Sequence, residues 1–148
     1  MTNTGNLGTI EAANPVLTVA PLKEDTEMLR ATEKITALYC RLSVEDLKED
    51  KNGGKGDVSN SIQNQKDILL RYAKEHRFPN PTFFVDDGYS GTNYDRPGFQ
   101  QMLSEIEAGK VAVVLSKDLS RLGRNSSLTG LYINFTFPKY GVRYIAIN

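Results

Sequence analysis

The stretch Ile35–Ser43, ITALYCRLS, constrains the fold most, because it is an apolar run that ends in an arginine and a serine on alternate positions. A short apolar run between polar segments predicts a buried β-strand. Alternate side chains of a strand point to the same face, so Tyr39, Arg41 and Ser43 share one face, with neighbours about 6.6 Å apart. The sequence therefore predicts a fixed cation beside a hydroxyl group at the end of a strand.

Strand and helix patterns alternate along the rest of the chain. Apolar runs predict strands at Ile35–Leu42, Phe83–Val85, Val111–Leu115 and Val142–Ile147. Helical spacing of apolar residues predicts helices over 60–76, from Asp95-Arg96-Pro97 to Gly109, and through Leu128, Leu131, Tyr132 and Phe135 to near Pro138. This alternation predicts an α/β fold with a mainly parallel central sheet flanked by helices, whose ligand site lies at the carboxyl ends of the strands.

The chain of 148 residues, 39% of them hydrophobic, is long enough for one domain with a sizeable core. Residues 1–34 lack sustained periodicity and predict a disordered N-terminal tail, although Glu24–Lys34 could form a short helix. Residues 35–148 form the predicted folded domain. Because the chain stops one residue after its last predicted strand, this domain is expected to be truncated at its C-terminal end.

The charge distribution permits a phosphate-binding site. The chain carries 18 basic and 18 acidic side chains, but the acids are concentrated in residues 1–34 and 44–58, each with three basic and five acidic side chains. The remaining residues carry twelve basic and eight acidic side chains, an excess of four positive charges. This mild excess does not predict a broad nucleic-acid surface. Residues 44–58, charged and rich in glycine, predict an exposed loop beside Ser43 that is the least ordered part of the domain.

Arginines recur in a pattern that suits a phosphoryl group. Arg121 and Arg124 are three residues apart and point the same way on a helical turn. Together with Arg41 and Arg96, four guanidinium groups could converge on one anion, and a serine hydroxyl beside them could attack phosphorus. The alternative is that these arginines are solvated or paired with the acids Asp87, Asp95 and Asp118.

Other chemistries have weaker support in the sequence. His76 is the only histidine and lies at the end of a predicted helix, far along the chain from Ser43. Asp86 and Asp87 could bind Mg²⁺, but adjacent strand residues point to opposite faces and no third ligand is evident. The sequence contains no glycine-rich phosphate-binding loop, so it does not predict a nucleotide cofactor. Cys40 cannot form an internal disulfide and alternates into the core, which fits a reducing cytoplasm.

Four co-linear motifs, YCRLS, SIQNQ, DDGYSGTNYDRPGF and LSRLGRN, closely resemble the catalytic domain of serine recombinases, the resolvase/invertase superfamily, especially its large transposon-encoded members. The resemblance covers Ile35–Asn148. By position, Ser43 matches the nucleophile, and Arg41, Arg121 and Arg124 match the active-site arginines. The residues that match supporting, DNA-phosphate positions are Gln63, Asp87, Ser90 and Arg96, with Ser120 where small resolvases often have an aspartate that orients the neighbouring arginine. Here the acid is displaced to Asp118.

This resemblance implies cleavage of double-stranded DNA by the serine hydroxyl, through a 5′-phosphoseryl intermediate, with strand exchange and religation. It implies no metal and no nucleotide cofactor, no membrane association, and a homo-oligomer that assembles from dimers into a synaptic tetramer in the full-length protein. Two alternatives stay open. The chain could be a catalytically silent oligomerisation or DNA-associating module of such a recombinase, or an unrelated phosphate-binding α/β protein.

Overall fold

The structure is a computed structural model that describes residues 33–44, 46 and 61–148. The described residues belong to one compact unit, Glu33–Asn148. The predictions for residues 1–32, including most of the expected tail and of the short helix, lie outside the described residues. So does nearly all of the predicted loop 44–58.

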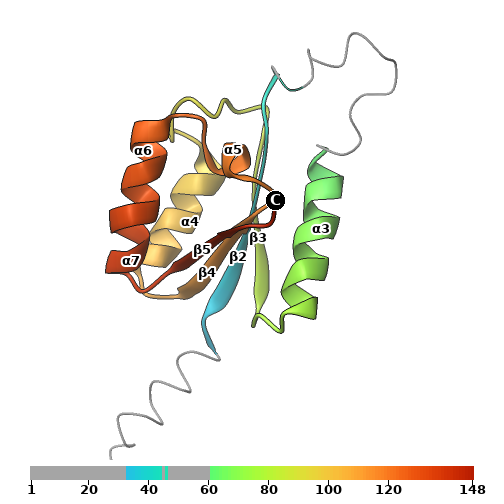
Figure 1. Cartoon of the computed structure of the whole chain (residues 1–148), viewed down its shortest axis with the longest axis vertical. Helices are drawn as coiled ribbons and strands as arrows, with labels where there is room; N and C mark the ends of the chain where they lie inside the picture. Colours follow the sequence, from blue (N-terminus) through green and yellow to red (C-terminus); the bar gives the residue numbers. More distant parts are fainter. Residues whose placement is uncertain (1–32, 45, 47–60) are drawn as a thin grey trace, which may run out of the picture. The chain divides into compact units, whose positions relative to one another are not determined.

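The described residues form a four-stranded parallel sheet, which confirms the predicted α/β class (Figure 1). Its strands are β2 (Ile35–Leu42), β3 (Pro81–Asp87), β4 (Val111–Ser116) and β5 (Arg143–Ala146), in the spatial order β3-β2-β4-β5. The central pair, β2 and β4, is buried almost throughout, as continuous apolar runs in parallel sheets usually are.

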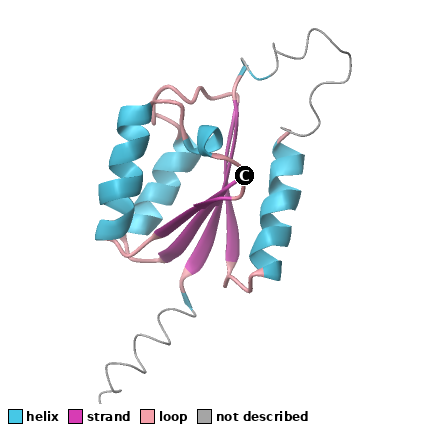
Figure 2. Cartoon of the chain, in the orientation of Figure 1, coloured by secondary structure: helices cyan, strands magenta, loops and turns pink. Residues whose placement is uncertain are grey.

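Helices cover both faces of this sheet (Figure 2). One face packs against α3 (Ile62–Glu75), through a core that contains Leu38, Cys40, Leu69 and Ala73. The other face packs against α4 (Pro97–Glu107) and the last helical segment, with Tyr39, Phe99 and Phe137 in its core. The last segment consists of α6 (Ser126–Leu131), the π-helical η3 (Tyr132–Thr136) and α7 (Phe137–Lys139).

Local signals explain where α3 begins and where α4 begins and ends. Pro97 occupies the first turn of α4, and Gly109 follows this helix with a φ of +76°, a conformation that glycine adopts without strain. The N-cap of α3 is Ser61, whose side chain accepts a hydrogen bond from the Asn64 amide. Position 60, where the predicted helix 60–76 begins, lies outside the described residues.

Of the apolar stripe predicted on the last helix, Tyr132 packs against the core and the other three residues do not. Leu128, Leu131 and Phe135 are 37%, 52% and 67% exposed, whereas Thr129 and Phe137 are buried. Leu128 and Leu131 precede the π-helical turn and lie on the solvent face of α6. The turn itself changes the angular offset between successive residues, so the face expected for Phe135 from a continuous α-helix does not hold. None of the helices in the part of the chain that the structure describes is long and apolar enough to cross a lipid bilayer.

Candidate active site

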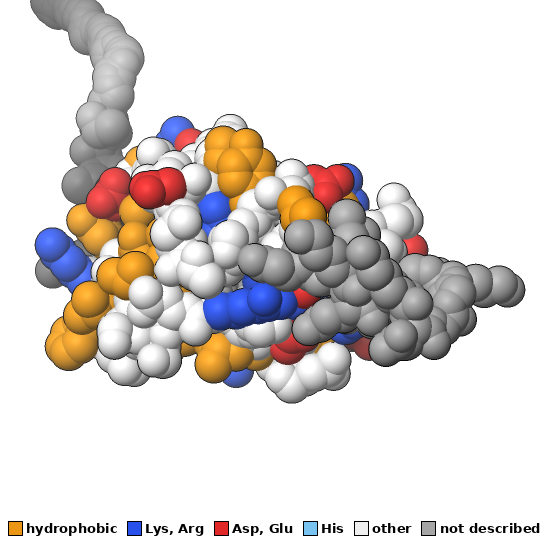
Figure 3. Space-filling view, turned by 90° about the horizontal axis from the view of Figure 1, so that it is seen from above, with side chains coloured by type: hydrophobic (Ala, Val, Ile, Leu, Met, Phe, Trp, Pro, Cys, Tyr) orange, Lys and Arg blue, Asp and Glu red, His pale blue; other side chains and the backbone are white. Residues whose placement is uncertain are grey.

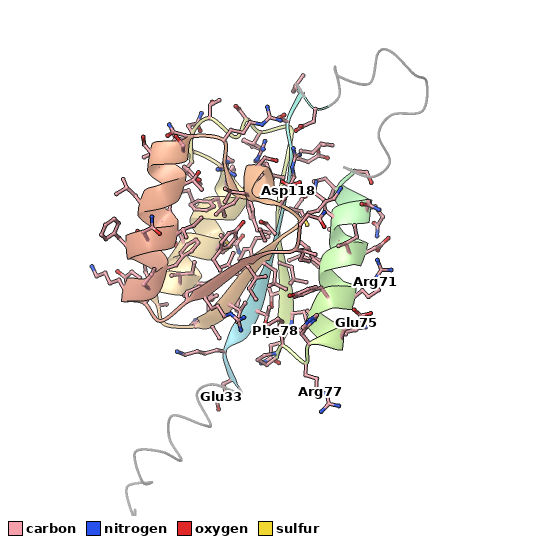
Figure 4. All side chains as sticks on the ribbon, in the orientation of Figure 1. Glu33, Arg71, Glu75, Arg77, Phe78 and Asp118 are labelled. Atoms are coloured by element: carbon pink, nitrogen blue, oxygen red, sulfur yellow. The ribbon has the colours of Figure 1, made fainter. Side chains whose placement is uncertain are left out.

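Polar residues gather at the carboxyl ends of β2, β3 and β4. Ser43 directly follows β2, and the four-residue helix α5 (Leu119–Leu122) follows β4. Asp118 lies at this edge beside α5, whereas Arg77 and Phe78 lie at the opposite end of the sheet (Figure 4). Viewed from the carboxyl ends of the strands, Lys and Arg side chains gather near the middle of the surface (Figure 3). The site therefore lies where parallel strands ordinarily place a ligand.

Ser43 is almost fully buried and is held by the carboxylate of Asp46. Its hydroxyl donates to Oδ2 of Asp46 at 2.5 Å, and its amide donates to the same oxygen at 2.7 Å. The Asp46 amide in turn donates to the Ser43 hydroxyl at 3.2 Å. The position and orientation of the proposed nucleophile are therefore set by one acidic side chain, which the sequence analysis had placed in an exposed loop.

The same carboxylate binds two arginines. Arg121 donates from Nη1 to Oδ2 of Asp46 at 3.1 Å and from Nη2 to Oδ1 at 3.0 Å, which is a bidentate pair. Arg124 donates from Nη2 to Oδ1 at 2.7 Å. The side chains of Asp46 and Arg121 are each 5% exposed, and that of Arg124 is 35% exposed. Ser43, Arg121 and Arg124 thus surround a single anion.

Hydrogen bonds keep this anion charged. Burial alone would raise the pKa of the Asp46 carboxyl, but the hydrogen bonds from Arg121 and Ser43 outweigh burial and hold the pKa well below its usual range. At neutral pH Asp46 is therefore a carboxylate, and Ser43 is the donor in the hydrogen bond between the two side chains.

Arg41 is fully buried and directs its guanidinium group at backbone carbonyl groups. It donates to the carbonyl oxygens of Arg121, Tyr89 and Ser120 at 3.2, 3.0 and 2.6 Å. Burial, and then the charges of Arg121 and Arg96, lower the pKa of Arg41 to about 10, so it stays protonated at neutral pH. In this structure Arg41 joins the segment after β3 to the turn of α5.

Arg96 is likewise buried, 1% exposed, and its hydrogen bonds go to groups other than the Asp46 carboxylate. It donates to the Asn93 carbonyl at 2.9 Å, the Tyr39 hydroxyl at 2.8 Å and the Leu122 carbonyl at 2.8 Å. Its guanidinium lies 4.4 Å from the centre of the Tyr94 ring. The expected convergence of four guanidinium groups is therefore not what the structure shows: two contact the anion, and two bind backbone carbonyls inside the protein.

Two glutamines of α3 differ sharply in position. Gln63, a predicted supporting residue, is exposed and donates to Asp67 at 2.8 Å. Gln65 is fully buried: its Oε1 accepts from the Arg41 amide at 3.1 Å, and its Nε2 donates to the Arg41 carbonyl at 3.0 Å. Gln65 holds the backbone beside the site, and the sequence analysis missed it. Gln65 lies four positions before Leu69, and this helical spacing places both residues on the same, buried face.

At the end of β3 the structure likewise buries the neighbour of a predicted site residue and exposes the predicted residue itself. Asp87 is exposed, whereas the neighbouring Asp86 is buried and accepts from the Tyr39 hydroxyl at 2.6 Å and from the Gly98 and Phe99 amides at 2.7 and 2.9 Å. Asp86 thus fixes the start of α4. Ser90, also predicted at the site, exchanges a hydrogen bond of 2.9 Å with the Thr92 hydroxyl.

Asp118 supports Arg121 from the start of α5. Its Oδ1 accepts from the Ser120 hydroxyl at 2.6 Å and from the Arg121 amide at 3.0 Å. The same oxygen lies 3.7 Å from Nε of Arg121, a nitrogen for which no described residue provides a hydrogen-bond partner. The displaced acid therefore contacts the arginine that an aspartate at position 120 would have been expected to orient.

The remaining candidates lie away from the anion. Cys40 is buried in the core, where burial raises the pKa of its thiol to about 12, and His76 is exposed and stacks on Tyr72 at 3.9 Å. Within residues 33–44, 46 and 61–148, no three His, Cys, Asp or Glu side chains group in a way that could hold a metal ion.

Comparisons with known proteins agree on one family. The model of the family described as "Resolvase, N terminal domain" matches residues 36–148. No curated protein matches significantly. The structure resembles the N-terminal catalytic domain of TP901-1 integrase, with a TM-score of 0.64 and 28% identity over 78% of this chain and 78% of that one. It also resembles the C-terminal catalytic domain of ISC1926 TnpA, an IS607-like serine recombinase, with a TM-score of 0.60 and 26% identity over 77% of this chain and 67% of that one.

A third solved structure, the first open reading frame of transposon ISC1904 from Sulfolobus solfataricus P2, shares the fold, with a TM-score of 0.55 and 20% identity over 78% of this chain and 67% of that one. The family match spans most of the chain, and its solved neighbours include catalytic domains of serine recombinases. The chain therefore belongs to the resolvase N-terminal domain family of serine recombinase catalytic domains.

Proposed function

We propose that this chain catalyses site-specific DNA recombination, with Ser43 as the nucleophile that attacks a DNA phosphodiester. The observation that carries the proposal is the single anion shared by the Ser43 hydroxyl, Arg121 and Arg124. A nucleophile and two cations that already meet at one anion are the components that a phosphoryl-transfer site needs. The family membership supports the same reaction.

In the proposed reaction a bond forms between Ser43 Oγ and phosphorus, and the bond from phosphorus to the 3′ oxygen breaks. The products are a 5′-phosphoseryl enzyme and a free 3′-hydroxyl, which receives the proton lost by the serine. Arg121 and Arg124 stabilise the negative charge that develops on the phosphoryl oxygens. Because the intermediate is itself a phosphodiester, a 3′-hydroxyl of another strand can reverse the reaction without a nucleotide cofactor.

The other polar residues are proposed to hold this site in shape. Arg41 and Arg96 bind the carbonyl oxygens of α5, and Gln65 binds the backbone of Arg41. The partner is double-stranded DNA. Each chain supplies one Ser43, and exchange between two duplexes breaks four strands, so the reaction requires four copies of the chain in a synaptic assembly.

The test joins the chain to a zinc-finger module of known specificity and supplies nicked duplexes that carry the module's sites around a randomised core. We expect a covalent protein–DNA adduct that Ser43→Ala abolishes while DNA binding stays nearly unchanged. Arg121→Ala should keep the nucleophile but reduce adduct formation about 10²–10³-fold, as removal of other preorganised charge-stabilising donors does.

Ser104→Ala is the matched control, because Ser104 is an exposed hydroxyl on α4 that donates to the Gln100 carbonyl. It should form the adduct at the rate of the unaltered chain. An adduct that persists in Ser43→Ala would refute the serine mechanism. A folded, unaltered chain that binds the duplexes but never forms an adduct would favour the catalytically silent module instead.

A further inference from the structure

We infer that Asp46 is a positioning residue that occupies the place of the scissile phosphate in the DNA-free protein and yields that place when DNA binds. The inference rests on the proposed function, since it assigns a position to the phosphate on which Ser43 acts. Nothing in the motifs that identify the family pointed to Asp46, which was counted only among the acids of residues 44–58.

The hydrogen bonds around Asp46 are those that a phosphate would need. Its two carboxylate oxygens accept from the fork of Arg121, from Arg124, and from the amide and hydroxyl of Ser43. The guanidinium fork fits carboxylate and phosphate alike, because both present two anionic oxygens in similar geometry. Two non-bridging phosphate oxygens in these positions would bring phosphorus to roughly 3–3.5 Å from Ser43 Oγ, a near-attack distance.

The two anions compete for the same donors. The Arg121 fork binds one pair of oxygens at a time, and a second negative charge beside the Asp46 carboxylate would be repelled in a partly buried site. Binding of the DNA phosphate therefore requires that Asp46 leave the fork. In this respect Asp46 lowers the affinity of the site for phosphate.

Asp46 also orients the groups of the site before DNA binds. Arg121 is only 5% exposed at its side chain, and without Asp46 its nearest described anion would be Asp118, 3.7 Å from Nε, which leaves the two Nη atoms of the buried fork without an anion. With Asp46 in place, the fork and the Ser43 hydroxyl are already oriented around an anion before DNA arrives. The low pKa of this carboxyl makes it a weak base, so Asp46 orients the hydroxyl and does not remove its proton.

The experiment measures binding of inorganic phosphate to the whole chain by calorimetry, at fixed ionic strength. Asp46→Asn, which keeps the size of the side chain and removes its charge, should bind phosphate at least tenfold more tightly than the unaltered chain, which corresponds to about 1.4 kcal/mol. Asp67→Asn is the control, because Asp67 is an exposed acid on α3 that contacts Gln63, and its affinity should not change. Adding Arg124→Gln to Asp46→Asn should remove the gain. An affinity for phosphate that is unchanged or weaker in Asp46→Asn overturns the inference.

A second measurement uses the unaltered chain and decides the question even if Asp46→Asn does not fold. Phosphate is titrated while the carboxyl ¹³C resonances of Asp46 and Asp67 are followed by NMR. Displacement should shift the Asp46 resonance toward that of a solvated carboxylate and leave Asp67 in place. If the side-chain resonances of Arg121 and Arg124 shift while that of Asp46 does not, phosphate binds without displacing Asp46 and the inference fails.

These measurements involve no cleavage. If Ser43→Ala still formed the adduct, the serine mechanism would fall, but a gain in phosphate affinity in Asp46→Asn would stand. If the adduct depended on Ser43 while phosphate affinity did not respond to Asp46, the displacement alone would fall.

Discussion

Replacement of Arg96 by methionine should destabilise the whole domain, because Arg96 supports the site from inside the protein. The substitution keeps an unbranched apolar stem and removes the guanidinium group. Three acceptors lose their donor: the carbonyls of Asn93 and Leu122 and the hydroxyl of Tyr39. Tyr39 keeps its hydrogen bond to Asp86 and Asn93 is an exposed residue, so of these three acceptors only the Leu122 carbonyl is left buried without a partner, at a cost of about 1–3 kcal/mol.

Part of this cost is offset, because the protein no longer has to bury a charge. Contacts between the guanidinium and the rings of Tyr94, Phe99 and Tyr39, at 4.4, 5.2 and 5.6 Å, are lost as well. We expect the free energy of unfolding to fall by about 2–4 kcal/mol, from the unpartnered Leu122 carbonyl and the lost contacts with the aromatic rings. That loss is a large part of the total stability of a domain.

The assay is urea denaturation followed by far-ultraviolet circular dichroism and by tyrosine fluorescence, since the chain has no tryptophan. Arg71→Met is the matched control: Arg71 is an exposed arginine on α3, and its replacement should change the free energy of unfolding by less than about 0.5 kcal/mol. A loss below about 1 kcal/mol in Arg96→Met, with an unchanged denaturant dependence, would refute the reasoning and would return Arg96 to the candidates for direct phosphate contact.

Three further predictions concern the site itself. In Gly91→Ala the new Cβ would lie 2.8 Å from Nη2 of Arg41 and 3.0 Å from Cγ of Arg124, so adduct formation should fall at least about tenfold. The control is Gly130→Ala, whose Cβ would meet nothing closer than 3.8 Å, and equal rates of adduct formation in the two variants would contradict the prediction. Folding lowers the pKa of Asp46, so its contribution to stability is complete above the unfolded pKa of about 3.9 and is lost as the pH falls toward the lower folded value. The difference in unfolding free energy between the unaltered chain and Asp46→Asn should therefore shrink between pH 5 and pH 2, and a constant difference would disprove it. EDTA should leave the rate of adduct formation unchanged, and a drop in that rate would sink the metal-free mechanism.

Much of the fold could be predicted because its signals are local. The predicted strand Ile35–Leu42 has the same bounds in the structure, and α4 starts at Pro97 as expected. Apolar continuity and a proline in the first turn act within a few residues, so they are visible in sequence. The π-helical turn Tyr132–Thr136 has no comparable signal, so the face of Phe135 was predicted wrongly for that reason. Leu128 and Leu131 precede the turn, and their spacing alone did not show that this face of α6 meets solvent.

The site was less predictable, because its contacts join segments that are distant in sequence. Asp46 looks like any acid of a solvated loop, and its role depends on Arg121, which lies seventy-five positions away. Gln63 and Gln65 differ by two positions, about 200° around a helix, so an error of two residues exchanges the solvent face for the core face. The buried row of Gln65, Leu69 and Ala73 shows that a polar residue in line with an apolar stripe deserved more weight than the motif match of its neighbour.

The four arginines of the motifs divide by burial, and the division explains how so short a helix as α5 holds a catalytic group. A helix of four residues has carbonyl groups that its own backbone cannot satisfy. Here the successive carbonyls of Ser120, Arg121 and Leu122 accept from guanidinium groups, the first two from Arg41 and the third from Arg96. Cations at the C-terminal end of a helix are favoured by its dipole, so this arrangement offsets part of the cost of burying the two charges. The fully buried pair thereby fixes the turn, and the turn presents the side chains of the other pair to the anion beside Ser43.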